Sequence, residues 1–324
     1  MTWRALFLVL SVALTSCADS WSRKLPDDAA KIQIVNPVSF VDATGLSVAT
    51  RIAFPTAGNR LPVVLFSHGA YSSKDEYNLI LDFWAAHGYV VIAPTHRDST
   101  SLGVARGSND PRRFVWRLDD MALLSAQLEQ LAAKVPALAG RVDLTKVVAA
   151  GHSFGGLIAQ TLGGATYFDP AAGKTVSRHD ARIKAVIIFS GAGRLPPLLR
   201  AEDFATLLVP TLVTVGTEDL KQSAISGYRW RREPYDLIPA ENRYLLVLQG
   251  ADHYLGGLVC RDDLPHAAQG PQWLSLFNEV TLAFMDAALQ RDSSAPRRLA
   301  QLLDRTAHAK NGIARTWHRD AVQD

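Results

Sequence analysis

The sequence predicts an α/β fold in which a mostly parallel central sheet of about eight strands carries helices on both faces. Two observations lead to this prediction. Near-continuous apolar runs such as LPVVLFS (61–67) and YVVIAP (89–94) are typical of strands buried on both faces. Segments with apolar residues at helical spacing lie between these runs, and such alternation produces parallel strands joined by right-handed crossovers.

The first half of the chain supplies the edge of this sheet and its first parallel strands. IQIVNPVSFVDA and LSVATRIAFP are rich in β-formers and interrupted by Pro and Gly, which predicts antiparallel edge strands. A helix is expected over 77–88, where Gly88 ends it. The next helix is expected to start at 109–111, because Asp110 can cap it and Pro111 fits its first turn. Its apolar positions recur at helical spacing at Phe114, Leu118, Met121, Leu128, Leu131 and Val135.

The second half continues the alternation. KVVAAG (146–151) predicts a strand and GGLIAQTLGG the helix after it, and IKAVIIFSG, TLVTVG and YLLVLQG predict three more strands. WLSLFNEVTLAFMDAAL (273–289) predicts a closing amphipathic helix. Residues 292–324 are charged and rich in Arg, and their pattern leaves open whether they form a docked helix or a tail.

Composition favours one catalytic domain over residues 31–291, followed by a charged extension over 292–324. Of the 324 residues, 48% are hydrophobic and 20% are charged, which is enough apolar material for one sizeable core. No linker rich in Pro, Gly and Ser divides the chain. The net charge of +3 is too small to indicate a nucleic-acid partner.

The first residues are expected to direct export. Arg4 precedes a short apolar run, ALFLVLSVAL, that ends in LTSC, a pattern that resembles the lipobox of bacterial lipoproteins. We expect a signal peptide over 1–16, lipidation of Cys17, a polar spacer over 17–30 and membrane anchoring, with Ala18 favouring the outer membrane. The alternative is a plain secretory peptide and a soluble periplasmic or secreted protein. Cys260, the one other cysteine, has no spaced Cys or His partners, so we expect a packed residue and no metal site.

Residues 147–156, VVAAGHSFGG, contain the motif G-x-S-x-G between a predicted strand and a predicted helix, which is the context in which the motif indicates a nucleophile. Ser153 would occupy a strained turn, and Gly151 and Gly155 would leave room for it. The turn would expose the Ser153 hydroxyl at a helix N-terminus, where developing negative charge is favoured. The alternative is a turn of small residues that serves packing alone.

A serine hydroxyl needs a base, and the base needs a group that orients it. In this strand–turn–helix context the acid and then the histidine follow the serine in the chain. Asp219 ends TLVTVGTED and His253 follows YLLVLQ, so both are expected at the same sheet edge as Ser153. Glu218 remains an alternative acid, and Asp252 is expected to be a turn residue.

The oxyanion would be held by backbone N–H groups of Ala70 and Phe154, because SHGA (67–70) ends the first buried strand. Four other histidines are expected to have non-catalytic roles. His68 would brace the loop by hydrogen bonds and His152 would pack, while His87 and His96 show no supporting partner.

The motifs GHSFGG, GTED and GADH, together with residues 61–100, resemble the α/β-hydrolase superfamily. The resemblance covers about residues 50–290 and is strongest to the branch of dienelactone hydrolases and platelet-activating-factor acetylhydrolases, near bacterial polyester hydrolases. It implies a serine hydrolase with a small lid or none and without a cofactor. The acetylhydrolases carry their acid after the strand that here ends FSGAG, so the departure moves the acid to Asp219.

Two basic stretches are expected on the active-site side: SLGVARGSNDPRRFVWR with Arg112 and Arg113, and GYRWRREPY with Arg229 and Arg231. They could bind a carboxylate or phosphate, and the alternative is a solvated face. Tyr71 and Trp230 are further candidates for contact with substrate, and in both cases a packing role is the alternative.

The sequence therefore predicts a serine hydrolase that cleaves carboxylic esters through an acyl-enzyme on Ser153. Its substrate would be a small molecule or a polymer, and no pattern predicts the oligomeric state. Two alternatives remain: an amide hydrolase of an anionic polymer of the poly(aspartate) type, and a lipid-anchored binding protein without catalysis on the same scaffold.

Overall fold

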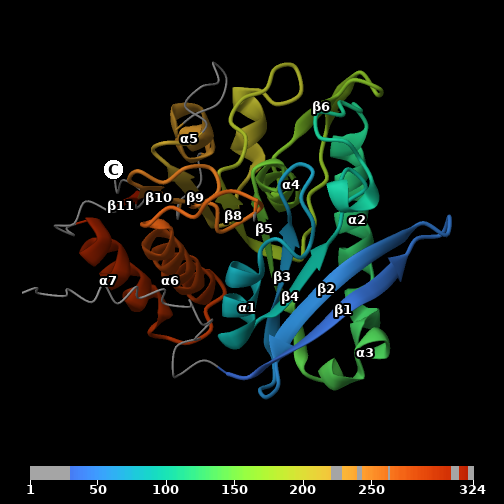
Figure 1. Cartoon of the computed structure of the whole chain (residues 1–324), viewed down its shortest axis with the longest axis horizontal. Helices are drawn as coiled ribbons and strands as arrows, with labels where there is room; N and C mark the ends of the chain where they lie inside the picture. The colour runs from blue at the N-terminus through green and yellow to red at the C-terminus, as the bar shows by residue number, and fades with distance from the viewer. Residues whose placement is uncertain (1–29, 220–227, 239–242, 262, 308–313, 320–324) are drawn as a thin grey trace, which may run out of the picture.

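The computed structural model describes residues 30–219, 228–238, 243–261, 263–307 and 314–319 (Figure 1). Cys17 and the expected signal peptide and spacer lie outside these residues, apart from Ala30. The strands of the main sheet are β1 (Ile32–Val41), β2 (Ser47–Pro55), β3 (Leu61–Ser67), β4 (Val90–Pro94), β5 (Val142–His152), β8 (Ile183–Phe189), β9 (Thr211–Gly216), β10 (Arg243–Leu248) and β11 (Ala314–Arg319). The helices are α1 (Asn78–Ala86), α2 (Arg113–Ala126), α3 (Leu131–Lys134), α4 (Phe154–Gly163), α5 (Tyr228–Leu237), α6 (Gly270–Ala288) and α7 (Ala295–Ala307).

Within the described part of the chain, nine strands form one sheet in the order β1-β2-β4-β3-β5-β8-β9-β10-β11. The six strands from β4 to β10 are parallel, while β1, β2 and β11 pair antiparallel at the two edges. This confirms the predicted mostly parallel sheet. A small antiparallel pair, β6 (Tyr167–Asp169) and β7 (Lys174–Val176), stands apart from it.

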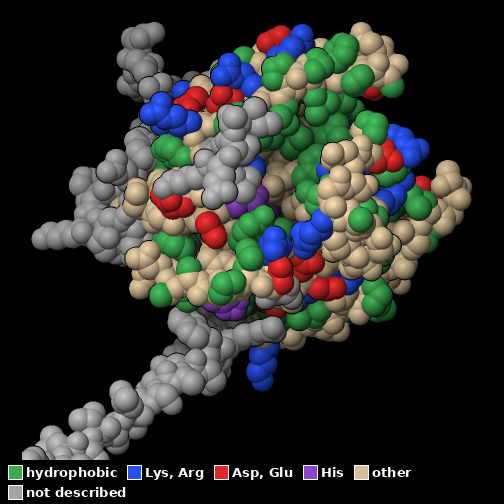
Figure 2. Space-filling view, turned by 45° about the horizontal axis from the view of Figure 1, so that its top comes forward, with side chains coloured by type: hydrophobic (Ala, Val, Ile, Leu, Met, Phe, Trp, Pro, Cys, Tyr) green, Lys and Arg blue, Asp and Glu red, His purple; other side chains and the backbone are tan. Residues whose placement is uncertain are grey.

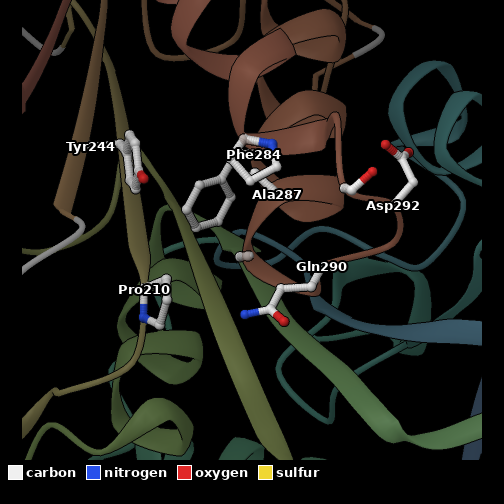
Figure 3. Close-up of a pocket in the computed structure, with 9 residues that line it drawn as sticks. Pro210, Tyr244, Phe284, Ala287, Gln290 and Asp292 are labelled. Carbon is white, nitrogen blue, oxygen red and sulfur yellow. The ribbon is translucent and has the colours of Figure 1, made fainter.

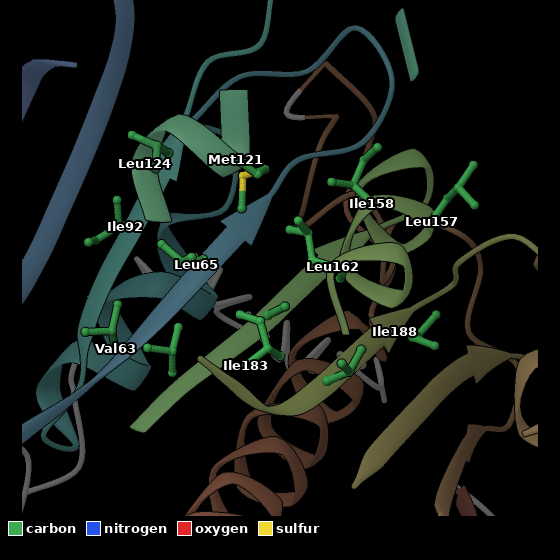
Figure 4. Packing of buried hydrophobic residues seen from close by; sticks show 14 of the residues in the cluster. Val63, Leu65, Ile92, Met121, Leu124, Leu157, Ile158, Leu162, Ile183 and Ile188 are labelled. Carbon is green, nitrogen blue, oxygen red and sulfur yellow. The ribbon is translucent and has the colours of Figure 1, made fainter. Parts of the chain in front are cut away.

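The core lies on both faces of the sheet because successive side chains of a strand point to opposite sides. In β3, Val63 and Leu65 belong to the cluster covered by α2 and α4, while Val64 and Phe66 belong to the cluster covered by α1 and α6. Figure 4 shows the first cluster, where Met121 of α2 meets residues of the strands and of α4. Figure 1 shows α1, α6 and α7 together over the other face.

The helix expected from residue 109 differs from the prediction at both ends. It begins at Arg113, because Asp110 accepts the Arg112 N–H (2.9 Å) and so caps the turn before the helix. It ends at Ala126, where Arg182 donates to the Ser125 carbonyl (2.7 Å) and satisfies an open helix end. The later apolar positions are still buried, but on a 3₁₀ turn and the short α3.

The extension after residue 291 contributes a helix and a strand. Helix α7 packs against α6, and β11 extends the sheet beyond β10. Helix α5 forms in the loop after β9, a conformation that the sequence pattern leaves open. Among the described helices, none combines the length and the apolarity that a membrane crossing requires.

Candidate active site

The turn between β5 and α4 places Ser153 at a strained position. Its backbone has φ +55° and ψ −116°, a conformation that a non-glycine residue seldom adopts. A Cβ on Gly151 would lie 2.1 Å from the Gly155 carbonyl oxygen, and a Cβ on Gly155 would lie 1.9 Å from the Ser67 carbonyl oxygen. Both positions therefore require glycine, and the turn holds the Ser153 side chain out at the start of α4.

Three side chains from different strand ends meet at this turn. His253 Nε2 lies 2.9 Å from Ser153 Oγ, and His253 Nδ1 lies 2.9 Å from Asp219 Oδ1. Asp219 follows β9 and His253 follows β10, so the carboxyl ends of parallel strands bring together residues 100 and 34 positions apart. The acid on His253 is Asp219 and not Glu218. Asp252 is a turn residue whose carboxylate accepts the backbone N–H groups of Tyr254 and Gly256.

Burial and nearby charges determine the protonation states of His253 and Asp219. Burial is the main cause that lowers the pKa of His253, and the Arg231 charge lowers it further, against the raising effect of Asp219. Burial alone would raise the pKa of Asp219, but the hydrogen bond and charge of His253 and the charge of Arg231 outweigh it and hold that pKa below its usual value. The imidazole is therefore neutral, and the carboxylate is ionised, near neutral pH.

The loop after β3 is held against the start of α4 by a buried arginine. Arg117 pairs with both carboxylate oxygens of Asp98 (Nε to Oδ1 and Nη2 to Oδ2, 3.0 Å each) and donates to the carbonyls of His68 and Gly69. The Arg117 guanidinium also lies over the Phe154 ring, 4.6 Å from its centroid. These contacts hold the backbone just before Ala70 and the side chain of Phe154, the two residues of the expected oxyanion site.

A buried chain of hydrogen bonds joins this loop to the histidine loop. Gly69 N–H donates to the Tyr77 hydroxyl (2.9 Å), which lies 2.8 Å from His152 Nδ1. His152 Nε2 lies 2.9 Å from the His253 carbonyl oxygen. Since a carbonyl can only accept, Nε2 carries the proton and Nδ1 accepts from Tyr77. His152 is therefore more than a packing residue, because it ties the backbone of His253 to the loop after β3.

His96, for which the sequence shows no partner, is fully buried and hydrogen-bonded on both ring nitrogens. Its Nε2 lies 2.9 Å from Ser67 Oγ and its Nδ1 lies 2.9 Å from Asp120 Oδ2. The expectation of an unsupported surface or loop residue was therefore wrong. Asp120 lies on the buried face of α2, one turn beyond Trp116, and no sequence pattern pairs it with a strand end. His68 does brace the loop as expected: its Nδ1 lies 2.7 Å from the Gly69 carbonyl oxygen, and its Nε2 accepts the His96 N–H.

A pocket of about 410 Å³ opens beside Ser153. Figure 2 shows hydrophobic side chains gathered in a hollow on one face of the molecule, with charged side chains around it. Most of the pocket wall is apolar, contributed mainly by α2, α4, the loop after β8 and α5: Phe114, Phe154, Leu157, Leu195, Leu198 and Trp230.

The basic residues that the sequence singles out are mostly committed to protein groups. Arg112 pairs with Asp110 on the surface, and Arg231 is buried with its Nε 3.0 Å from Asp219 Oδ1. Arg229 is exposed and lines a different cavity, with Arg194 and Arg232. Of these arginines, Arg113 and Arg231 line the pocket beside Ser153, and both already contact protein acceptors, so the four do not form one anion site.

Arg113 does line the pocket, but its Nη1 already donates to the Tyr71 hydroxyl and the Ser108 carbonyl, and its guanidinium lies over the Tyr71 ring. Tyr71 itself is not part of the pocket wall; it supports Arg113. Trp230 is in the wall, and its indole N–H donates to the Arg194 carbonyl (2.8 Å).

The buried roles of Arg117 and Arg231 were not predicted from the sequence. The signal for Arg117 is its place on the apolar face of α2, three residues after Phe114 and four before Met121. The signal for Arg231 is similar, because Pro234 and Tyr235 are buried on the same face of α5. A lone Arg on an apolar helix face indicates a buried ion pair.

A second cavity of about 510 Å³ lies between α6 and the start of β9 and β10, lined by Pro210, Tyr244 and Phe284 among others (Figure 3). It contains no residue of the Ser153 site. In the described ranges, no cluster of three His, Cys, Asp or Glu side chains is placed to hold a metal ion. Cys260 is buried, as expected of a packed residue.

The comparisons with known proteins agree with this architecture. A family model described as chlorophyllase matches residues 29–167, which include Ser153 but end before Asp219 and His253. Chlorophyllase-1 of Arabidopsis thaliana is 42% identical over 60 residues, so the match spans 18% of this chain and 18% of that relative. The structure resembles that of a Klebsiella pneumoniae protein assigned as a dienelactone hydrolase, with a TM-score of 0.52 and 18% identity over 79% of this chain and 98% of that one.

Proposed function

We propose that this α/β-hydrolase, whose fold is that of the dienelactone hydrolases, is a serine hydrolase of carboxylic esters. The observation that carries the proposal is the unbroken path from Ser153 Oγ through His253 to Asp219, with 2.9 Å at each step, beside an open pocket. The matching family model, chlorophyllase, supports ester hydrolysis in general.

In the proposed reaction His253 Nε2 takes the Ser153 hydroxyl proton while Oγ attacks the ester carbonyl. The backbone N–H groups of Phe154 and Ala70 would receive the negative charge of the tetrahedral intermediate. Phe154 is in the first turn of α4, so its N–H has no intrahelical acceptor. Collapse of the intermediate expels the alcohol, which takes the proton from His253, and leaves an acyl-enzyme. A water molecule, activated by His253, then releases the acid and restores Ser153.

The pocket favours an ester with an uncharged, apolar group over an anionic polymer. Its wall is mainly hydrophobic, and the guanidinium groups of Arg113 and Arg231 already have protein acceptors. A free carboxylate would have to compete with these acceptors and lose its hydration in an apolar pocket. We therefore place amide hydrolysis of an acidic polymer below ester hydrolysis.

A fluorophosphonate probe and a substrate panel test the proposal together. The fluorophosphonate should label Ser153 of the wild-type protein. The protein should hydrolyse esters with an apolar acyl group, for example octanoate esters, faster than matched hemisuccinate esters or poly(aspartate). Chlorophyll belongs in the panel because of the matching family model. Ser153→Ala should show neither labelling nor turnover. If the wild-type protein shows neither, the reading as a binding protein without catalysis replaces this one.

We also propose that the chain is anchored to a bacterial membrane through lipid on Cys17, with the outer membrane favoured. The support is the apolar run followed by LTSC at the N-terminus. Cys17→Ser should move the expressed protein out of the membrane fraction. Retention of that variant in the membrane would contradict lipid anchoring at this residue.

A further inference from the structure

A buried arginine reaches the proposed triad from behind the acid. Arg231 is 6% exposed and extends from α5 to Asp219, where its Nε lies 3.0 Å from the same Oδ1 that faces His253 Nδ1. Its Nη1 donates to the carbonyls of Ser190 and Gly191, just after β8. One guanidinium therefore bridges the ends of β8 and β9 and fixes the oxygen that orients the catalytic base.

We propose that Arg231 is the positioning residue of the catalytic acid, and that it sets how readily His253 is protonated. The inference rests on the proposed function, because it assigns a role in that same site. Since Arg231 Nε and the His253 imidazole share Oδ1, Arg231 holds in place the oxygen that His253 binds. Asp219 Oδ2 is buried and makes no hydrogen bond to a described residue, although the nearby Ser190 side chain contributes to lowering the Asp219 pKa. The carboxylate is therefore held mainly through Oδ1, where Arg231 and His253 bind.

The positive charge has a second consequence. An imidazolium at His253 would be stabilised by Asp219, but part of that stabilisation is cancelled by Arg231 on the same oxygen. Among the residues that the structure describes, the other titratable groups that face His253 are Asp252 on its own loop, Tyr254 beside it, and the neutral His152 ring 4.6 Å away. Arg231 is the one cation in this set, and it lowers the pKa of both Asp219 and His253.

Two substitutions separate the positioning of Asp219 from the effect of the positive charge. Arg231→Met removes both the guanidinium hydrogen bonds and the charge. Arg231→Lys keeps a charge but cannot bind Asp219 Oδ1 and two carbonyls at once. We expect kcat to fall about tenfold to 100-fold in both, with KM for a short neutral ester nearly unchanged, because a misplaced catalytic group slows the chemical step. In Arg231→Met the acid limb of the kcat/KM profile should move to higher pH, whereas in Arg231→Lys it should stay near that of the wild-type enzyme.

Arg232→Met is the matched control, because Arg232 is the next residue of α5 and pairs with Asp236 at the surface. It should leave kcat and the pH profile unchanged. Thermal unfolding and circular dichroism establish that each variant is folded, and if Arg231→Met is not folded, Arg231→Lys still gives the kcat test.

The inference is overturned if the folded Arg231 variants keep the wild-type kcat, or if Arg231→Met loses kcat without a shift of the acid limb. Failure of the proposed function would look different, since the wild-type protein itself would then lack labelling and turnover.

Discussion

Two hydrogen-bonded chains of Ser, His and Asp lie on the same side of this sheet, and only one has the setting of an active site. Ser153, His253 and Asp219 are joined by distances of 2.9 Å and 2.9 Å, and Ser67, His96 and Asp120 are joined by the same distances. In both chains an arginine is bound to the carboxylate, Arg231 in the first and Arg97 in the second. Hydrogen-bond geometry alone does not distinguish them.

The surroundings of the serine distinguish them. Ser67 is the last residue of β3, fully buried, whereas Ser153 is on a strained turn at a helix start and lines an open pocket. The arginines also differ: Arg97 binds the carboxylate oxygen that His96 does not use, while Arg231 shares one oxygen with His253. A relay becomes a catalytic site when its hydroxyl can reach a substrate and an oxyanion donor.

The largest expected contrast is between the two serines. Ser153→Ala should lower kcat by at least about 10⁴-fold, because the nucleophile is lost. Ser67→Ala should keep kcat within about tenfold of the wild-type value, but should lower the free energy of unfolding by about 1–3 kcal/mol, because His96 Nε2 loses its buried partner. Ester turnover and denaturant unfolding measure the two effects. Equal loss of activity in both variants would mean that the buried chain of Ser67, His96 and Asp120 takes part in the chemistry.

The two acids should separate in the same way. Asp219→Asn should lower kcat by about 10³- to 10⁴-fold with the fold intact, since the His253 tautomer is no longer fixed. Asp120→Asn should mainly lower stability, by about 3 kcal/mol, because Asp120 is buried between His96 and Arg97. Glu218→Gln serves as the neighbouring control, and if it loses more activity than Asp219→Asn, the acid assignment is wrong.

Acid should inactivate the protein in two separable ways. Burial lowers the pKa of His68, His96 and His152 well below 6.5, so in the folded protein they stay neutral while their unfolded forms take up protons. The unfolded state then binds more protons, and stability should fall as pH drops below about 6.5, by at most about 1.4 kcal/mol per pH unit for each histidine. Above that pH these histidines are neutral in both states, so they add no pH dependence to stability.

Activity should instead fall reversibly in the folded protein as His253 is protonated. Urea unfolding and initial rates measured over pH 5–8 separate the two processes. Unfolding free energies that stay constant down to pH 5 would contradict the buried neutral histidines.

The weakest of the predicted effects concerns the hydrogen-bonded link between the loop after β3 and the loop that carries His253. Tyr77→Phe removes the hydroxyl that accepts from Gly69 and donates to His152. We expect kcat to fall by about fivefold to tenfold with little change in KM, which corresponds to about 1–1.4 kcal/mol for one buried hydrogen bond. Double-mutant analysis with His152→Gln gives the measure: additive effects of the two substitutions would show that the chain does not couple the loops.

Much of the fold follows from local patterns that the sequence displays directly. The apolar runs from 61 to 67 and from 244 to 248 form strands within the parallel part of the sheet, and near-continuous apolar runs are typical of such strands. The end of α2 at Ala126 was not predictable, since the helical spacing continues to Val135 and the break depends on Arg182, which is distant in the sequence.

The candidate site divides in the same manner. From the sequence we could predict Ser153, His253 and an acid at 218 or 219 as partners, because the carboxyl ends of parallel strands lie at one edge of the sheet. The choice of Asp219 over Glu218 came from the structure, in which Asp219 Oδ1 lies 2.9 Å from His253 Nδ1.

Only the packed structure shows that the arginines near the pocket bind protein groups, and only it reveals the buried chain of Ser67, His96 and Asp120. A buried charge is stabilised by partners that can lie anywhere in the chain: Arg117 is held by Asp98 and Arg231 by Asp219, from other elements of the fold. Local composition records the presence of such a charge, but only the packed structure determines which group neutralises it.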